Sequence, residues 1–160
     1  MASDADFQTA VAFVLQQEGG YVNNPADPGG ETKYGISKRD YPALDIPSLT
    51  IAEASGIYYT DYWTQSGAAG VDMPLAMIVL DTGVNMGNEE AQVLLGQTTD
   101  PGQYLKLRQL RYQELAAANP KLQVFLTGWY RRLTALGAAA GVQAWRTLPG
   151  ASPVGSPRRP

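Results

Sequence analysis

The sequence predicts a mainly α-helical fold with one irregular region after the first helix. Apolar residues recur at helical spacing near the N-terminus and again through most of the chain after residue 50. Between these parts, residues 20–49 are rich in Asn, Pro, Gly and Asp, which favour turns and loops. The chain has 160 residues, which is the length of one domain.

The first helix is expected to begin at Ser3 or Asp4, since both residue types cap helix N-termini. Its apolar residues are Phe7, Val11, Val14 and Leu15. Gly19 and Gly20 follow and are expected to end it. Within the irregular region, residues 33–37 are expected to form a short β-hairpin.

Local signals also place the later helices. Thr50 and Glu53 form a capping-box pattern that opens a helix. Further helices are expected from Pro74, after Asn88, after the Asp100–Gly102 turn and from Pro120, with a last short one over residues 138–145. In the helix after Asn88, both Val93 and Leu94 are expected to face inward.

The chain contains no His and no Cys. This excludes Ser-His-Asp and Cys-His nucleophile systems and zinc sites built from His or Cys. An enzyme made from the remaining residue types needs carboxylates, Tyr, Lys, Ser or Thr, or an oxygen-ligated metal. Glycoside hydrolysis by Asp and Glu needs no other group. We therefore expect no cofactor and no metal.

Charge is distributed unevenly along the chain. Residues 1–102 hold 14 acidic and 3 basic residues, whereas residues 103–160 hold 1 acidic and 9 basic residues. One interpretation is that the two halves attract each other within one fold. The other is that the C-terminal half attracts an anionic polymer.

Glu18 is a candidate for acid–base chemistry on physical grounds. It follows Val11, Val14 and Leu15 at helical spacing, which puts a carboxylate at the end of an apolar stripe. Partial removal from water would raise its pKa and keep it protonated, as a general acid requires. A helix-end Glu that reaches water or pairs with an Arg fits the same position.

The segment after Glu18 strengthens the functional interpretation. Gly19 and Gly20 leave the backbone bare, so a bulky polymer can approach. A loop that folds back brings Asp27 and Thr32 opposite Glu18, where a second carboxylate can serve as base or nucleophile. Two alternatives compete, because Asn and Asp are common turn formers and clustered oxygen ligands bind calcium. However, Pro residues at 25 and 28 break the EF-hand pattern.

Several blocks of sequence carry a family resemblance. They are EGGYVNNP at 18–25, DPGG at 27–30 and TKYGIS at 32–37, followed by Tyr58, Tyr62 and Trp63, by Asp81, Val84, Asn85 and Gly87, and by Gly128, Trp129 and Arg132. Together they resemble glycoside hydrolase family 108, whose members are N-acetylmuramidases found as phage endolysins and as muramidases that assist secretion. The resemblance spans most of residues 7–137.

The resemblance implies a lysozyme-like fold and assigns the catalytic acid to Glu18. The order of Glu18, Asp27 and Thr32 in this chain is also similar to the Glu-Asp-Thr arrangement of phage lysozymes. This similarity makes Asp27 and Thr32 catalytic candidates. In this chain four residues, rather than five, separate Asp27 from Thr32. We expect one catalytic domain over residues 1–146. Residues 147–160, which are mostly Pro, Gly, Ser and Arg, are expected to be a flexible tail.

Substrate contacts are expected from residues near Glu18 and from two polar or aromatic positions further along. The first group consists of Gly19, Gly20, Tyr34 and Gly35. Tyr62 is expected to stack on a sugar, although aromatic residues at helical spacing are more often core. Asn85 can bind an N-acetyl group or a buried backbone group. Asp81 can pair with a buried Arg such as Arg132, and Trp129 is expected to anchor the core.

The expected function is hydrolysis of the β-1,4 bond between N-acetylmuramic acid and N-acetylglucosamine in peptidoglycan glycan strands, as in a phage endolysin. The alternatives are a lytic transglycosylase, which would use Glu18 alone, and a catalytically silent wall-binding or secretion-accessory protein. We expect a monomer that binds no nucleic acid and does not insert into membranes. It would be made in the cytoplasm without a signal peptide and reach the wall or periplasm through a holin-type pore or a dedicated secretion route.

Overall fold

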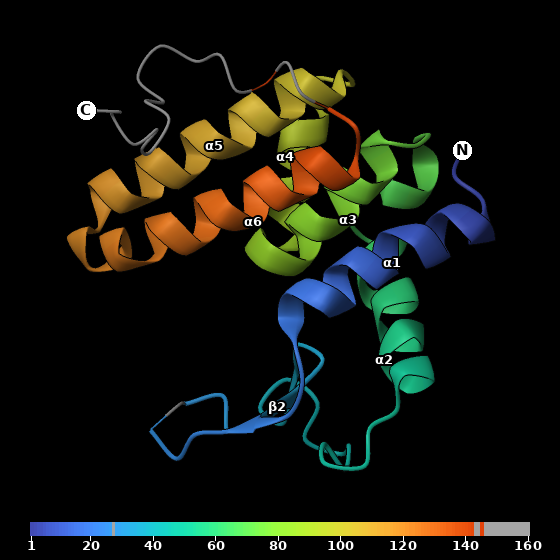
Figure 1. The fold of residues 1–160 in the computed structure, drawn as a ribbon, viewed down its shortest axis with the longest axis vertical. Helices are drawn as coiled ribbons and strands as arrows, with labels where there is room; N and C mark the ends of the chain where they lie inside the picture. Colours follow the sequence, from blue (N-terminus) through green and yellow to red (C-terminus); the bar gives the residue numbers. More distant parts are fainter. Residues whose placement is uncertain (27, 143–144, 146–160) are drawn as a thin grey trace, which may run out of the picture.

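The computed structural model describes residues 1–26, 28–142 and 145, and within them the fold is mainly helical (Figure 1). The helices are α1 (Asp4–Glu18), α2 (Ile51–Tyr58), α3 (Leu75–Met86), α4 (Asn88–Leu95), α5 (Pro101–Ala118) and α6 (Leu126–Ala139). Three shorter helical segments are η1 (Tyr59–Trp63), η2 (Ala68–Gly70) and η3 (Pro120–Phe125). The predicted fold class is confirmed.

Helix α1 begins and ends where its capping residues predict. The Ser3 side chain accepts a hydrogen bond from the Asp6 amide, and the Asp6 carboxylate accepts one from the Ser3 amide, which completes a capping box. At the other end Gly19 adopts φ 75°, a conformation that favours glycine. Glu18 is therefore the last residue of α1, directly before the chain leaves the helix.

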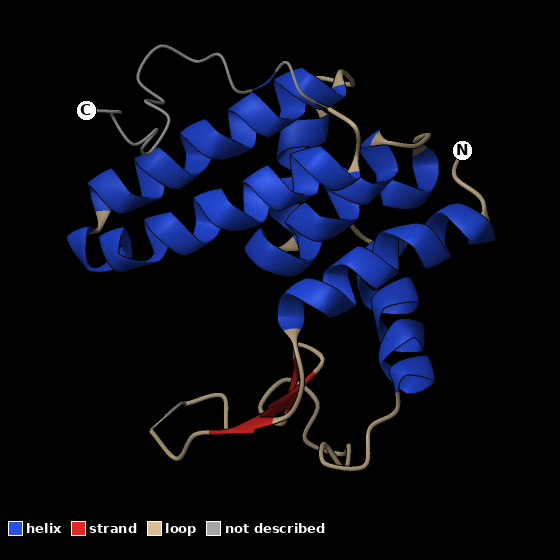
Figure 2. Ribbon diagram, in the orientation of Figure 1, coloured by secondary structure: helices blue, strands red, loops and turns tan. Residues whose placement is uncertain are grey.

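The strands lie together, apart from the helices (Figure 2). Strands β1 (Val22–Asn23), β2 (Glu31–Lys33) and β3 (Ile36–Ser37) form an antiparallel sheet in the order β1-β2-β3. Thr32 is opposite Val22 on one side and Ser37 on the other. The hairpin predicted over residues 33–37 is confirmed as β2 and β3, while β1 has too short an apolar pattern to be seen in the sequence.

Helix α3 lies at the centre of the core. Its residues 75–83 are all buried, and it packs against α1, α4, α5 and η2. A helix that is buried all round is hydrophobic on every face, and α3 follows this rule except at Asp81 and Thr82. A buried carboxylate requires partners, and its partners define the candidate site.

Helix α2 begins at the predicted capping box of Thr50 and Glu53. It continues into the single π-helical turn η1, which the sequence did not predict. Such turns insert one extra residue per turn and rotate the side chains that follow. Here Tyr58 and Trp63 lie in the core while Tyr62 is only half-buried.

The remaining predictions have mixed outcomes. Asp100 caps α5, and Asn119 with Pro120 ends it, as expected. Leu94 is buried in α4, but the inward placement of Val93 is wrong, because Val93 is 52% exposed. The last short helix is also wrong at its start, since α6 runs unbroken through residue 139.

Two further expectations are not tested. Residues 147–160, predicted as a tail, lie outside the described residues. The single catalytic domain over residues 1–146 stays a prediction. Among the described residues, none of the helices combines the length and apolarity that crossing a membrane requires.

Candidate active site

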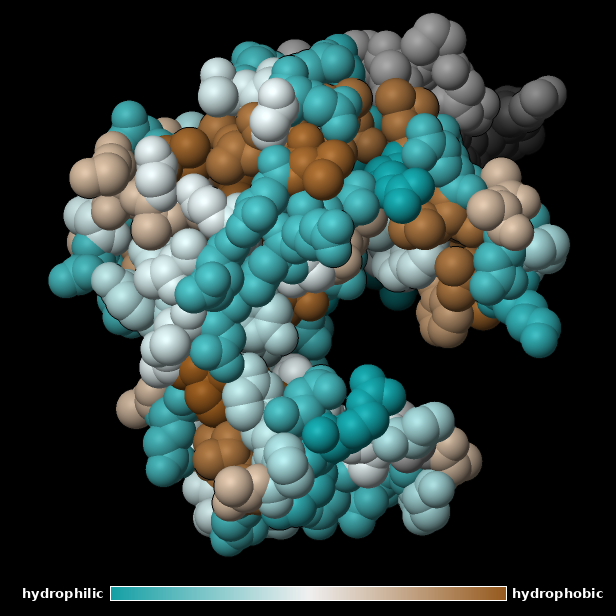
Figure 3. All heavy atoms as spheres, turned by 180° about the vertical axis from the view of Figure 1, so that it is seen from behind, coloured by the Kyte–Doolittle hydropathy of each residue, from teal (hydrophilic) through white to brown (hydrophobic). Residues whose placement is uncertain are grey.

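A deep hollow separates the larger, mainly helical part of the molecule from the part that holds the strands (Figure 3). Helix α1 ends at the junction of these two parts, so its last residue, Glu18, lies at the junction too (Figure 1). The Glu18 side chain is 23% exposed, which leaves it accessible while most of it is covered. This is a suitable place for a carboxylate that contacts a polymer lying between the two parts.

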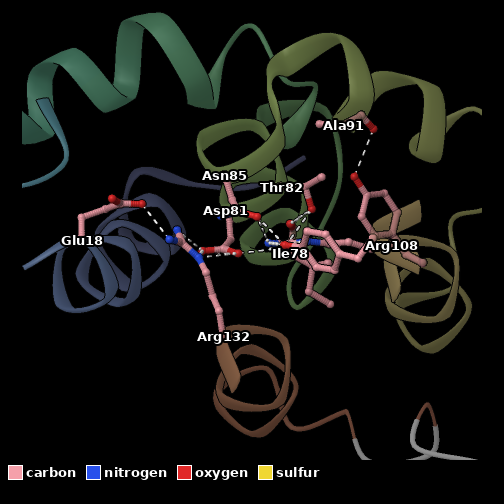
Figure 4. A network of polar contacts seen from close by, with 10 residues as sticks. Glu18, Ile78, Asp81, Thr82, Asn85, Ala91, Arg108 and Arg132 are labelled. Carbon is pink, nitrogen blue, oxygen red and sulfur yellow. Dashed lines mark hydrogen bonds and ion pairs between the residues drawn. The ribbon is translucent and has the colours of Figure 1, made fainter. Parts of the chain in front are cut away.

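Glu18 pairs with Arg132 of α6 (Figure 4). The Arg132 Nη1 group donates to Glu18 Oε1 at 2.7 Å. The same guanidinium donates from Nε and Nη2 to Asp81 Oδ1, at 3.0 and 2.8 Å. The predicted pairing of Asp81 with Arg132 is confirmed. Because Asp81 holds one edge of the guanidinium, the other edge points at Glu18.

Asp81 also holds a second arginine. Arg108 Nη1 lies 2.7 Å from Asp81 Oδ2, and neither side chain has any exposed surface. Arg108 further donates to the hydroxyl groups of Thr82 and Tyr112. The chain Glu18–Arg132–Asp81–Arg108 therefore carries two negative and two positive charges in continuous contact. Its balanced charge permits the deep burial.

The neighbouring carboxylates raise the pKa values of both buried arginines. Burial opposes the charge on the Arg132 guanidinium, but attraction to Asp81 and Glu18 outweighs it and raises the pKa of Arg132 above its ordinary value. The pKa of Arg108 is raised in the same way, with burial opposed chiefly by Asp81. Both side chains stay cationic.

The ion pairs also bear on the two interpretations of the uneven charge distribution along the chain. Arg108, Arg111 and Arg132 all lie in the basic C-terminal part, and their partners Asp81, Glu90 and Glu18 lie in the acidic N-terminal part. The interpretation that the two halves attract each other within one fold is supported.

Gly35 lets the strand-bearing segment approach Glu18 closely. It adopts φ 79°, and a Cβ atom there would lie 2.8 Å from Glu18 Cγ and 2.9 Å from Oε2, besides colliding with the Tyr58 hydroxyl. Tyr34 before it also has a positive φ, 52°. Its carbonyl accepts a 2.6 Å hydrogen bond from the Tyr58 hydroxyl. The structure thus brings Gly35 and the backbone of Tyr34 to Glu18.

Tyr62 belongs to the same surroundings. Its ring lies 5.5 Å from the Tyr58 ring, centroid to centroid. Its pKa is raised by burial first, then by the negative charges of Asp40 and Asp61, with a smaller contribution from Glu18. Tyr62 therefore lies within electrostatic reach of Glu18, on the turn η1.

The other candidates near Glu18 have different outcomes. A Cβ atom at Gly19 or Gly20 would meet no atom within 4 Å, so the backbone beside Glu18 is open as expected. Thr32 lies in the middle strand, half-buried, and within the described residues no hydrogen bond joins it to Glu18. Asp27 lies outside the described residues, so its distance from Glu18 stays a prediction.

Asn85 is held by two side chains of α5. Its Oδ1 accepts hydrogen bonds from Arg108 Nη2, at 3.2 Å, and from the Tyr112 hydroxyl. Asn85 is thus attached to the Arg108 end of the ion-pair chain. Its expected role in substrate binding stays a prediction.

The roles of two residues of this site were not predicted from the sequence. Arg108 was not singled out, although its place between the buried residues Leu105 and Tyr112 puts a cation on an apolar face. Arg132 was named as part of the family resemblance and as a partner for Asp81, but its contact with Glu18 joins residues 114 positions apart. No local pattern predicts such a contact.

Within the part of the chain that the structure describes, no three His, Cys, Asp or Glu side chains gather as a metal site. The ion-pair chain contains two carboxylates, of which Asp81 is fully buried and Glu18 is accessible.

Comparison with protein families matches residues 11–87 to the family described as Glycosyl hydrolase 108. This segment includes Glu18, Gly35, Tyr62 and Asn85. Over these residues, just under half of its length, the chain is of the glycosyl hydrolase 108 type. That family is described as one of glycosyl hydrolases, which act on glycans.

Among solved structures, that of Brucella abortus SagA is similar to this fold, with a TM-score of 0.71 at 22% sequence identity. The alignment covers 86% of this chain and 95% of that chain. At this level of identity the likeness concerns the fold. A search of curated proteins returned no match.

Proposed function

We propose that this chain is a peptidoglycan hydrolase of the N-acetylmuramidase type, with Glu18 as the general acid. The proposal rests chiefly on one observation. An accessible carboxylate at the junction of the two parts of the molecule is held by Arg132 and closely covered by Gly35, within a segment of the glycosyl hydrolase 108 type. The bond cleaved would be the β-1,4 bond that follows N-acetylmuramic acid.

In the proposed reaction, Glu18 protonates the glycosidic oxygen as the bond to the leaving sugar breaks. Proton donation requires the neutral carboxyl form, so the contact with Arg132 loosens when the substrate is bound and Glu18 is protonated. Once the proton has left, Arg132 stabilises the carboxylate that remains. Asp81 keeps the guanidinium in place throughout, since it holds the opposite edge.

Asp27 is the proposed second carboxylate, with Thr32 helping to orient a water molecule. A wide separation between the two carboxyl groups would leave room for water and give inversion, whereas a short one would give a covalent intermediate and retention. The exposed backbone at Gly19 and Gly20, the turn of Tyr34 and Gly35, and the ring of Tyr62 would line the sugar-binding surface.

The test is the loss of turbidity of purified cell walls. Glu18→Gln keeps the size of the side chain but cannot donate a proton, so we expect clearing to fall by a factor of 100 or more, on the order expected for a lost general acid. Asp27→Asn is expected to follow it if Asp27 has the second role. Equal clearing by wild type and Glu18→Gln would refute the assignment of Glu18.

Mass spectrometry of the released fragments distinguishes hydrolysis from the transglycosylase alternative. Hydrolysis adds one water to each cleaved bond, and we expect reducing N-acetylmuramic acid ends. Anhydro ends would contradict the hydrolase assignment while leaving Glu18 as the acid. A wild type that binds walls and releases nothing would support the catalytically silent alternative.

We further propose that the protein acts as an endolysin on the wall or in the periplasm, as a monomer, after release through a holin-type pore or a dedicated secretion route. The expected absence of nucleic-acid binding belongs to the same proposal. Expression in a bacterium with and without a holin would test this, because lysis is expected only when the pore is present.

A further inference from the structure

The turn that covers Glu18 has an unfavourable sequence for its shape. Strands β2 and β3 pair through Lys33 and Ile36, so Tyr34 and Gly35 alone connect them. Both connecting residues have positive φ angles, 52° and 79°. A two-residue hairpin turn of this kind favours Asn-Gly or Asp-Gly, because a larger side chain is strained there. Since the sequence places a tyrosine in the turn, contacts from elsewhere in the fold hold its shape.

Tyr58 provides such a contact. It is the last residue of α2 and is 1% exposed. Its hydroxyl donates a 2.6 Å hydrogen bond to the carbonyl of Tyr34. The same hydroxyl lies beside Gly35, since a Cβ atom on that glycine would collide with it. One buried side chain is therefore adjacent to both residues of the turn.

The Tyr58 hydroxyl also lies near the proposed acid. A Cβ atom on Gly35 would lie 2.9 Å from Glu18 Oε2 as well, so the hydroxyl and this carboxyl oxygen both border the glycine. Burial raises the pKa of Tyr58 above its ordinary value, and the negative charge of Glu18 raises it further. Tyr58 therefore keeps its proton at neutral pH, and its hydrogen bond to the turn persists.

The two oxygens of the Glu18 carboxyl have different surroundings. Arg132 donates to Oε1 at 2.7 Å. A guanidinium group has donors only, which disfavours a proton on the oxygen that accepts from it. The proton that a general acid delivers is therefore placed on Oε2, the oxygen beside Gly35. The position of the turn determines how closely this oxygen is covered and where it points.

We propose that Tyr58 is a positioning residue for the proposed acid, because its hydroxyl holds the Tyr34–Gly35 turn against Glu18 Oε2. This role rests on the proposed function, in which Glu18 donates the proton. Arg132 fixes one oxygen of the carboxyl from the helical side. Tyr58 acts through the turn and fixes the surroundings of the other oxygen, while its own side chain stays buried away from the glycan.

A purely structural role is the alternative, since a buried hydroxyl needs an acceptor wherever it lies. Tyr104 is such a case. It is fully buried, and its hydroxyl donates to the carbonyl of Ala91 at 3.1 Å. Ala91 lies at the other end of the polar network from Glu18 (Figure 4). The two tyrosines therefore have similar burial and the same kind of bond, but only the acceptor of Tyr58 adjoins the proposed acid.

The test compares Tyr58→Phe with Tyr104→Phe. Each substitution keeps the ring and leaves a buried carbonyl without its donor, so we expect both to lower the melting temperature by about 3–6 °C. Initial rates of wall clearing are then measured at several wall concentrations, well below both melting temperatures. We expect Tyr58→Phe to lower the maximal rate about tenfold or more at an unchanged half-saturating wall concentration, because a misplaced acid slows the reaction without weakening glycan binding. Tyr104→Phe is expected to keep the wild-type rate.

Hydrogen exchange tests the physical step without turnover. Peptides that cover residues 31–37 report the backbone amides of the turn and its two strands. Their exchange is expected to be about tenfold faster in Tyr58→Phe than in the wild type, and unchanged in Tyr104→Phe. Equal exchange in the wild type and Tyr58→Phe would overturn the proposal, because the turn would then keep its place without the hydroxyl.

The rates can overturn the proposal too. A wild-type maximal rate in Tyr58→Phe, an equal loss in Tyr104→Phe, or a loss confined to the half-saturating concentration would contradict a positioning role. The proposed function fails separately. A Glu18→Gln protein that clears walls as fast as the wild type refutes the proposed acid, whereas the exchange measurements report only whether Tyr58 holds the turn.

Discussion

The helical side of the hollow holds its polar groups by buried ion pairs, whereas the strand-bearing side holds its groups by backbone conformation. Asp81 and Arg108 have no exposed surface, and each is held through several charged or polar contacts. Gly35 and Tyr34, in contrast, are placed by positive φ angles in a turn between two short strands. Glu18 lies between and touches both sides.

The difference determines how each side responds to change. A buried ion pair that loses one partner leaves an uncompensated charge, so its removal affects the whole fold. A turn that depends on glycine responds mainly to the addition of a side chain, and the effect stays near the turn. Removal on one side and addition on the other are therefore the informative experiments.

The largest effect is expected for Asp81→Asn. The substitution keeps the shape of the side chain but leaves Arg108 and Arg132 without their shared anion, which costs about 3–5 kcal/mol of unfolding free energy. Urea unfolding measures it. The control is Glu114→Gln, which breaks an exposed pair with Arg111 and should cost less than about 1 kcal/mol. Equal losses in the two variants would show that burial does not strengthen the Asp81 contacts.

An intermediate effect is expected for Gly35→Ala. The added Cβ collides with Glu18 and the Tyr58 hydroxyl and also strains the positive φ, so the unfolding free energy should fall by about 1–3 kcal/mol. Wall clearing should fall further than stability alone explains, because Glu18 is displaced. Gly56→Ala in α2 is the control, since it adds a methyl group in open space. Full activity in Gly35→Ala would contradict the close packing against Glu18.

The smallest effect is expected for Thr50→Ala, which removes the cap of α2 on the strand-bearing side. We expect the melting temperature to fall by about 2–4 °C at neutral pH. Hydrogen bonds from the Thr50 amide and hydroxyl lower the pKa of Glu53 below its ordinary value. A lowered pKa stabilises the fold at neutral pH, and this contribution is lost as the pH falls through that pKa.

The pH dependence of the Thr50 cap supplies its own control. The difference in melting temperature between wild type and Thr50→Ala should shrink in strong acid, where Glu53 is protonated in both states. A difference that stays constant from neutral to strongly acidic pH would rule out a contribution from the charge of Glu53.

The same contrast explains how far the sequence predicts this structure. Helix caps form contacts within a few residues along the chain, so they can be predicted from the sequence. The caps predicted in this way include Ser3, Gly19, Thr50 and Asp100. Glu18 and the strand-bearing turn were found through a contiguous motif.

Distant contacts were harder to predict. Arg132 reaches Glu18 from the other end of the chain, and Arg108 depends on where α5 crosses α3. Val93 was misplaced because a short helix with two adjacent apolar residues does not show which of them faces inward. The π-helical turn η1 has no local signature, although it contributes Tyr62 to the surroundings of Glu18.

The ion pair between Glu18 and Arg132 has a consequence for how the protein is made. Synthesis on the ribosome proceeds from the N-terminus, so Glu18 and the whole strand-bearing segment emerge long before α6. Until Arg132 emerges, Asp81 and Glu18 lack their shared cation, and the nascent chain has no assembled site. Release of a nearly complete chain is then a condition for activity, and a truncated product that ends before α6 would be inert.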